Sequence, residues 1–169
     1  MKKIIDTSWD FKNENTKTYT HCFHAYPAMM IPQIAKRLIE SFAGNAKLLF
    51  DPYCGTGTSL VEANLHNINA IGTDLNPLAR LISKVKTSKM NTQSLDLFIR
   101  DYNDFTFQLR FNGSNRKSVI IPKFDNIDFW FQQAVIEDLG IIKGYILEIS
   151  DENIKNFFKI AFSETVRES

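Results

Sequence analysis

The stretch that decides the fold is residues 46–79, AKLLFDPYCGTGTSLVEANLHNINAIGTDLNPLA, in which short apolar runs alternate with helical patterns. The spacing of the apolar residues predicts a strand, a helix, a second strand and a second helix, over 46–50, 58–67, 69–73 and 77–86. The first strand is a short apolar run and is expected to be buried. This alternation is typical of a doubly wound α/β sheet, whose parallel strands are joined by right-handed crossovers.

The rest of the chain is predicted to be mainly helical. Residues 1–26 are expected to be irregular apart from a short strand at 3–6, and residues 111–117 are expected to form a turn-rich loop. Asp151 is a candidate N-cap for a last helix. Apolar residues at helical spacing predict further helices over 30–42 and 92–109, and a third that follows the aromatic residues 129–131 and runs to about residue 149.

Length and composition limit the class of protein. A chain of 169 residues is long enough for one domain with its own core. Because only two strands show the pattern of such a sheet, we expect a partial α/β fold over 1–90 and an α-rich continuation or insertion over 91–169. Lys and Arg number 20 against 19 Asp and Glu, which gives a formal net charge of +1. A site for a polyanion would therefore have to be a local patch.

The sequence shows no membrane or secretion signal. The longest stretch without a charged side chain, 18–35, contains histidines and prolines and is not apolar enough to span a bilayer. Residues 1–10 lack the apolar core of a signal peptide. Two cysteines, Cys22 and Cys54, cannot form a disulfide framework. We expect a cytoplasmic protein.

The loop at 51–58, DPYCGTGT, carries the chemistry. Glycines at positions 55 and 57, between a strand and a helix, let the backbone approach a ligand and direct N–H groups at an anionic part of it. Asp51 ends the first strand and Asp74 ends the second, where an acid meets the ribose hydroxyls of a nucleoside in sheets of this kind. The pattern predicts a cofactor that contains a nucleoside and a carboxylate or phosphate.

Two other nucleotide sites fit this loop less well. A P-loop requires a lysine after the last glycine, and none follows Gly57. The dinucleotide fingerprint requires a third glycine where this chain has Leu60, so a nicotinamide cofactor is the weaker reading. A strand, turn and helix with glycines for packing alone would not explain the acids at both strand ends.

Two motifs carry a resemblance to a known family. The segment DPYCGTGTSLVEA at 51–63, followed by IGTDLNPLA at 71–79, resembles the S-adenosylmethionine-binding motif of amino-methyltransferases. HAYPAMMIP at 24–32 resembles the element that precedes this loop in site-specific DNA methyltransferases, and 125–131 and 161–167 are loosely similar to later parts of that family. The resemblance implies a partial Rossmann-like fold and methylation of the exocyclic amine of cytosine or adenine in a restriction–modification system.

The resemblance also implies roles for individual residues. The loop after the first strand would hold the methionine end of S-adenosylmethionine, the acid after the second strand its ribose, and the residues after that acid its adenine side, while 26–28 would close the pocket. Met29 stands where many relatives have lysine. The cofactor-binding candidates are Tyr26, Pro27, Ala28, Asp51, Pro52, Cys54, Gly55, Thr56, Gly57, Thr58, Asp74, Asn76 and Pro77.

The catalytic loop of that family is missing. Its Asp/Asn/Ser-Pro-Pro-Tyr/Phe sequence holds the flipped base, and these 169 residues contain no Pro-Pro pair. We therefore expect a chain that binds the cofactor but is inactive alone, because it is truncated, degenerate or completed by a second chain. The helical pattern at 164–169 has no stop signal, which favours an interrupted chain.

Other functions and other sites are also possible from the sequence. An RNA guanosine amino-methyltransferase and a non-catalytic partner subunit are the alternative functions. His21, Cys22 and His24 offer too few ligands for a metal site, so none is expected. The basic residues between 80 and 89 are read as a solvated helix face, and the aromatic residues at 129–131 as core. The candidates for contact with double-stranded DNA are Arg110, Arg116, Lys117 and Lys123.

Overall fold

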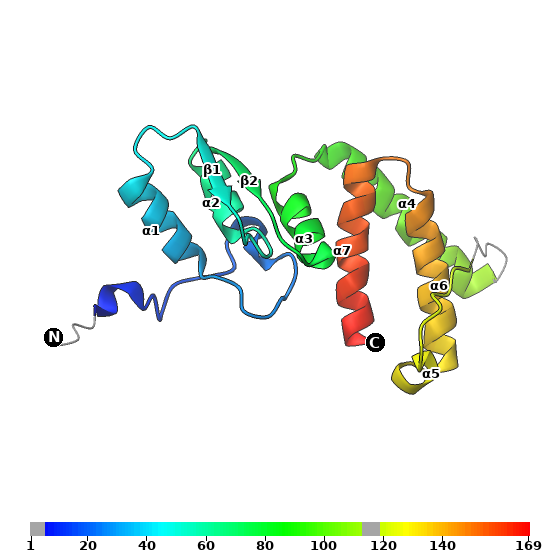
Figure 1. Ribbon diagram of the computed structural model, residues 1–169. Coiled ribbons are helices and arrows are strands. Elements are labelled where there is room, and N and C mark those ends of the chain that lie inside the picture. Colours follow the sequence, from blue (N-terminus) through cyan, green and yellow to red (C-terminus); the bar gives the residue numbers. More distant parts are fainter. Residues whose placement is uncertain (1–5, 113–118) are drawn as a thin grey trace. The chain divides into compact units, whose positions relative to one another are not determined.

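The computed structural model describes residues 6–112 and 119–169 (Figure 1). It divides into two compact units, Met1–Thr87 and Ser88–Ser169, which are described separately here. No helix in the described ranges is long and apolar enough to cross a membrane. In chain order the elements are η1 (Thr7–Trp9), η2 (Tyr19–Cys22), α1 (Pro32–Phe42), β1 (Leu48–Asp51), α2 (Thr58–Leu65), β2 (Asn69–Gly72), α3 (Pro77–Thr87), α4 (Thr92–Asn112), α5 (Ile127–Trp130), α6 (Gln133–Glu148) and α7 (Glu152–Glu168).

The first unit contains a two-stranded parallel sheet. β1 and β2 pair with Leu48 opposite Asn69 and Asp51 opposite Gly72, and α2 connects them. The strands and helices predicted between residues 30 and 86 are confirmed to within two residues at each end. A mixed α/β architecture is therefore present in this half of the chain.

One face of the sheet carries the core. α2 packs on both strands and α1 packs on α2, so that Ile39, Ala63 and Ile68 are buried together. The partly buried side chains beside them include those of Leu49 and Ala70, one from each strand. Because side chains alternate along a strand, these residues share the helix-covered face.

The expectation that β1 is buried is wrong for the face of the sheet that α1 and α2 do not cover. Leu48 is 54% exposed and Phe50 61% exposed, and Ile71 on β2 is exposed beside them. The apolar run at 46–50 gave no alternation from which to read a solvent-facing side. Both packing helices lie on the opposite face, and this is what decides which side chains are covered.

The basic residues of α3 also depart from prediction. Arg80 and Lys84 lie on an exposed face as expected, whereas Lys86 is only 5% exposed. Ile82 and Val85 form the buried side of the helix, and Lys86 is the next residue after that stripe. The reading of this segment as a solvated face is therefore wrong for Lys86.

The second unit is helical, as the sequence predicts. Its buried cluster joins α4, α6 and α7 through residues Phe105, Ile141, Tyr145, Ile146, Ile149, Ile154 and Phe158. The ring of Tyr145 stacks on Phe105 at 4.8 Å, and its hydroxyl donates to Asp101 at 2.6 Å. Asp151 caps α7 by accepting from the backbone N–H groups of Asn153 and Ile154, which confirms the predicted N-cap.

Two expectations for the second unit are corrected. Phe129 and Trp130 are 77% and 68% exposed rather than buried in a core. They lie on the one-turn helix α5, which ends where Phe131 adopts an extended conformation. The helix predicted to follow these aromatic residues is confirmed as α6. α4 extends to Asn112, and the remainder of the predicted loop, 113–117, lies outside the described residues, as does nearly all of the predicted strand at 3–6.

Candidate cofactor-binding site

The loop between β1 and α2 is held to the end of β2 by its backbone. Cys54 N donates to Thr73 O at 2.9 Å, and Thr73 N donates to Asp51 O at 3.0 Å. Asp51 accepts from Tyr53 N at 3.0 Å through one carboxylate oxygen and from the hydroxyl of Ser59 through the other. The two strand ends therefore lie side by side, as expected for parallel neighbours.

The two glycines of this loop both have positive φ, but their surroundings differ. Gly55 has φ +50°, and a Cβ placed on it would meet nothing within 4 Å. Gly57 has φ +82°, and a Cβ there would lie 2.9 Å from the Cβ of Ser83 on α3. Gly57 thus lets α3 approach the loop, while Gly55 leaves open space beside it.

Asp74 joins the loop to the segment that begins α3. One of its carboxylate oxygens accepts from Gly55 N at 3.0 Å, and the other accepts from Asn76 N at 2.8 Å. The side-chain amide of Asn76 donates to the hydroxyl of Tyr26 at 2.7 Å, while its oxygen accepts from Leu78 N. These contacts bring together three motifs that are up to 50 residues apart in sequence.

A pocket of about 320 Å³ opens at this junction. Eight of the thirteen predicted cofactor residues line it, which are those at 26–28, 51, 54–56 and 58. Asp74 and Asn76 do not line it but hydrogen-bond to Gly55 and Tyr26, which do. Its full lining is Tyr26, Pro27, Ala28, Met29, Met30, Asp51, Tyr53, Cys54, Gly55, Thr56 and Thr58.

The remaining predicted residues lie just outside the lining. Gly57 is buried against Ser83, and Pro52 and Pro77 are exposed beside the two loops. Met29, Met30 and Tyr53 line the pocket but were not among the predicted residues. Their signal in the sequence was their position inside the two motifs.

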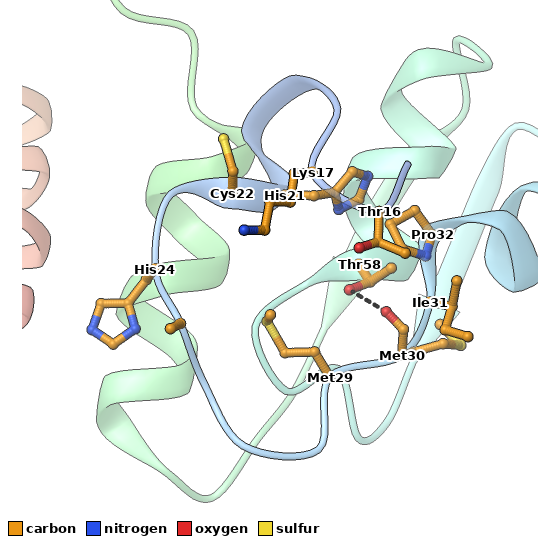
Figure 2. Close-up of a pocket in the computed structure, with 11 residues that line it drawn as sticks. Thr16, Lys17, His21, Cys22, His24, Met29, Met30, Ile31, Pro32 and Thr58 are labelled. Atoms are coloured by element: carbon orange, nitrogen blue, oxygen red, sulfur yellow. Dashed lines mark hydrogen bonds between the residues drawn. The ribbon is translucent and has the colours of Figure 1, made fainter. Parts of the chain in front are cut away.

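Figure 2 shows a second pocket, of about 350 Å³, which shares part of its lining with the first. Met29, Met30 and Thr58 line both pockets. The hydroxyl of Thr58 donates to the carbonyl oxygen of Met30 at 3.5 Å, drawn as a dashed line (Figure 2). The segment around residues 29–30 therefore lines both pockets and is attached to the first turn of α2.

The electrostatics of the first pocket disfavour a nucleophilic cysteine. Burial raises the pKa of the Cys54 thiol, and the nearby carboxylates of Asp51 and Asp74 raise it further, against an opposing hydrogen bond with Ser83. A thiol of raised pKa stays protonated at neutral pH and is a weak nucleophile. Cys54 is thus suited to line a pocket rather than to attack a substrate.

The other candidate groups are placed as follows. Among the described residues, no group of three or more His, Cys, Asp and Glu side chains could hold a metal ion. Of the DNA-contact candidates, Arg110 is exposed in the last turn of α4 and Lys123 is exposed after it. Arg116 and Lys117 lie outside the described residues.

Comparison with known proteins adds the family. The family model described as DNA methylase matches residues 1–85. The chain is 44% identical over 173 residues to the Type II methyltransferase M.MvaI of Kocuria varians, which covers 98% of this chain and 38% of that protein. It is 32% identical over 97 residues to the Type II methyltransferase M.MjaII of Methanocaldococcus jannaschii, covering 57% of this chain and 18% of that protein. The chain thus spans less than two-fifths of either relative, and no solved structure matches it.

Proposed function

Because this chain belongs to the DNA methylase family, we propose that it is the S-adenosylmethionine-binding part of a site-specific DNA methyltransferase. That family takes its methyl group from S-adenosylmethionine. One observation carries the proposal: the hydrogen bonds of Asp74 and Asn76 gather three motifs around a single pocket. We propose further that β1 and β2 open a Rossmann-like sheet, which residues 1–90 would begin.

The groups around the pocket suit the parts of this cofactor. Each carboxylate oxygen of Asp74 accepts one backbone hydrogen bond and keeps a second lone pair, which a ribose hydroxyl can use. The open space beside Gly55 allows close approach of a ligand to the backbone. Asp51 lies at the other strand end, where a carboxylate attracts a cationic amino or sulfonium group.

The reaction needs a group that this chain does not contain. S-adenosylmethionine supplies a methyl group bound to a positively charged sulfur, and the target exocyclic amine must be flipped out and aligned with it. The 169 residues include no Pro-Pro pair with which the family holds that amine. We propose that this chain binds the cofactor and that a segment outside these residues supplies the catalytic loop. Methyl transfer to duplex DNA by the purified chain would overturn this division.

Isothermal titration calorimetry tests the cofactor assignment. The 169-residue chain should bind S-adenosylmethionine, and Asp74→Ala should weaken binding at least about tenfold, since it removes an acceptor for the ribose and a hydrogen bond to the loop. Asp96→Ala, an exposed carboxylate on α4, is the matched control and should bind as the unaltered chain does. Binding of a nicotinamide dinucleotide in place of S-adenosylmethionine would contradict the proposal.

Contact with DNA is tested by its salt dependence. We propose that Arg110 and Lys123 touch phosphates when the complete enzyme binds double-stranded DNA. Each phosphate contact contributes about 0.9 to the slope of log K against log salt, so Arg110→Gln with Lys123→Gln should reduce the slope by about 2. Lys12→Gln, an exposed lysine of the first unit, is the control. A slope unchanged by the double substitution would exclude these two residues from the interface.

A further inference from the structure

A buried hydrogen bond links the segment before the pocket to α2. His21 Nε2 lies 2.9 Å from Glu62 Oε1, and the two residues are each 4% exposed. His21 Nδ1 has no hydrogen-bond partner within the described residues, so the bond from Nε2 to Glu62 is the one that holds the ring. A buried carboxylate or imidazole that loses its partner pays a desolvation cost, which makes such a link hard to break.

A second hydrogen bond anchors the same short helix to α3. The hydroxyl of Thr20 donates to the backbone carbonyl of Lys86 at 3.0 Å, in a partly buried position. η2, which contains Thr20 and His21, packs against both α2 and α3. The side chains of the consecutive residues Thr20 and His21 therefore attach η2 to α3 and to α2, respectively.

Residues 26–30 form a wall of the first pocket and begin four residues after the end of η2. Within this wall, Ala28 adopts a left-handed conformation with φ +57°. Hydrogen bonds attach this wall at both ends: the side-chain amide of Asn76 donates to the hydroxyl of Tyr26, and the hydroxyl of Thr58 makes a long bond to the carbonyl oxygen of Met30. In Figure 2, His21, Met29 and Met30 are drawn around the same second pocket.

We propose that His21 and Glu62 are positioning residues of the cofactor pocket. Their buried pair holds η2 against α2, and η2 in turn holds the wall at 26–30 in the position that binding of S-adenosylmethionine requires. This inference rests on the proposed function, because it concerns the affinity of the same pocket. Neither side chain belongs to the lining of that pocket, and the two are paired with each other.

Titration calorimetry with S-adenosylmethionine tests the pair. Glu62→Leu removes the acceptor with little change in size and should raise the Kd about tenfold, whereas Glu62→Gln keeps an amide oxygen for the ring and should stay within about threefold. Amides of 23–30 should exchange hydrogen faster in Glu62→Leu than in Glu62→Gln. A purely structural role would lower the melting temperature of Glu62→Leu without changing the affinity of the folded protein.

A second variant and a matched control complete the design. Thr20→Val deletes only the hydroxyl that anchors η2 to α3, and it should raise the Kd about threefold even if Glu62→Leu fails to fold. His66 and Glu40 form another His–Glu contact, 3.6 Å long and partly exposed. Glu40→Gln weakens that contact without removing the hydrogen bond between the His66 ring and the backbone carbonyl of Glu62, and it should leave the Kd unchanged.

The outcomes separate the two claims. If the unaltered chain binds and Asp74→Ala does not, but Glu62→Leu or Thr20→Val binds as tightly as the unaltered chain, the positioning role is wrong and the proposed function stands. If the unaltered chain gives no heat with S-adenosylmethionine, both are overturned. Equal weakening by Glu40→Gln and Glu62→Leu would also contradict the positioning role.

Discussion

At the scale of single residues, Gly57 carries two requirements at once. It has φ +82° at the N-terminal end of α2, and it lies against Ser83 of α3. Gly55, two residues earlier, has φ +50° but open space around it. A glycine is therefore needed at position 57 both for the backbone conformation and for the packing of α3, whereas position 55 needs it for the backbone conformation alone.

Gly57→Ala should destabilise the first unit by about 2–4 kcal/mol, because left-handed strain adds to a clash with Ser83. Gly55→Ala carries the strain alone and should cost about 1 kcal/mol. Urea denaturation of the two variants and the unaltered chain measures both free energies of unfolding. Equal losses at the two positions would show that the close approach of α3 does not constrain residue 57.

Lys86 is a residue whose burial costs stability at neutral pH. Its ammonium has no hydrogen-bond partner among the described residues, and burial lowers the pKa of the amine. A lysine with a folded pKa below its unfolded value binds more protons when unfolded, so stability rises with pH between the two values. Below the lowered pKa, the fold carries the cost of a buried charge.

Lys86→Met should therefore raise the free energy of unfolding at pH 7 by about 1–3 kcal/mol, since it keeps the length of the side chain and removes the charge. The variant should also lose the rise in stability that the unaltered chain shows as the pH approaches 10.5. Denaturation midpoints measured across pH 7 to 10.5 test this. A variant less stable than the unaltered chain at every pH would mean that the ammonium is satisfied.

At the scale of elements, the helices of the second unit are placed by local signals and by a shared aromatic core. α7 begins at a residue that accepts two backbone hydrogen bonds, and its buried stripe joins the cluster around Tyr145. α5, by contrast, is a single turn without a side-chain cap, and its aromatic residues remain exposed. A capped amphipathic helix of 17 residues can bury a stripe, whereas one turn of four cannot.

Asp151→Ala should lower the stability of the second unit by about 1 kcal/mol, within the 0.5–2 kcal/mol typical of lost N-caps. Asp151→Ser restores a capping oxygen and should recover most of the loss. Thermal unfolding followed by circular dichroism compares the two. If serine and alanine were equally destabilising, the contribution of Asp151 would lie in its charge near the helix N-terminus rather than in the cap.

At the scale of the whole molecule, the two units differ in charge and in content. Residues 1–87 carry ten Lys and Arg against seven Asp and Glu, a balance of +3, and residues 88–169 carry ten against twelve, a balance of −2. Every residue of the proposed cofactor pocket lies in the first unit. The similarity to M.MvaI covers 98% of the chain, so it includes both units.

Hydrogen exchange measured with and without S-adenosylmethionine should therefore separate the units. At a ligand concentration of 100 times the Kd, binding stabilises the folded protein relative to the unfolded one by about 2.7 kcal/mol. Hydrogen exchange at the amides of the 51–57 loop and of α2 should slow accordingly. Amides of α6 and α7 should exchange at unchanged rates. Uniform slowing across residues 88–169 would show that the two units respond to the cofactor together.

Much of the fold was predictable because its signals are local. Strand and helix positions between residues 30 and 86 followed from apolar spacing and from Pro32, Gly57 and Pro77 near helix starts. The pocket followed from motifs whose members are neighbours in sequence. Whether those residues bind S-adenosylmethionine stays a prediction until it is measured.

What the sequence by itself determined is the order of elements, the parallel α/β opening, the Asp151 cap and the set of loop residues that gather at the strand ends. Only the tertiary structure decided which side chains are covered: that Leu48 and Phe50 stay exposed, that Phe129 and Trp130 are not core, and that Lys86, His21 and Glu62 are buried. The physical reason is the range of the interactions. Backbone conformation depends on adjacent residues, whereas burial depends on helices and strands that arrive from tens of residues away.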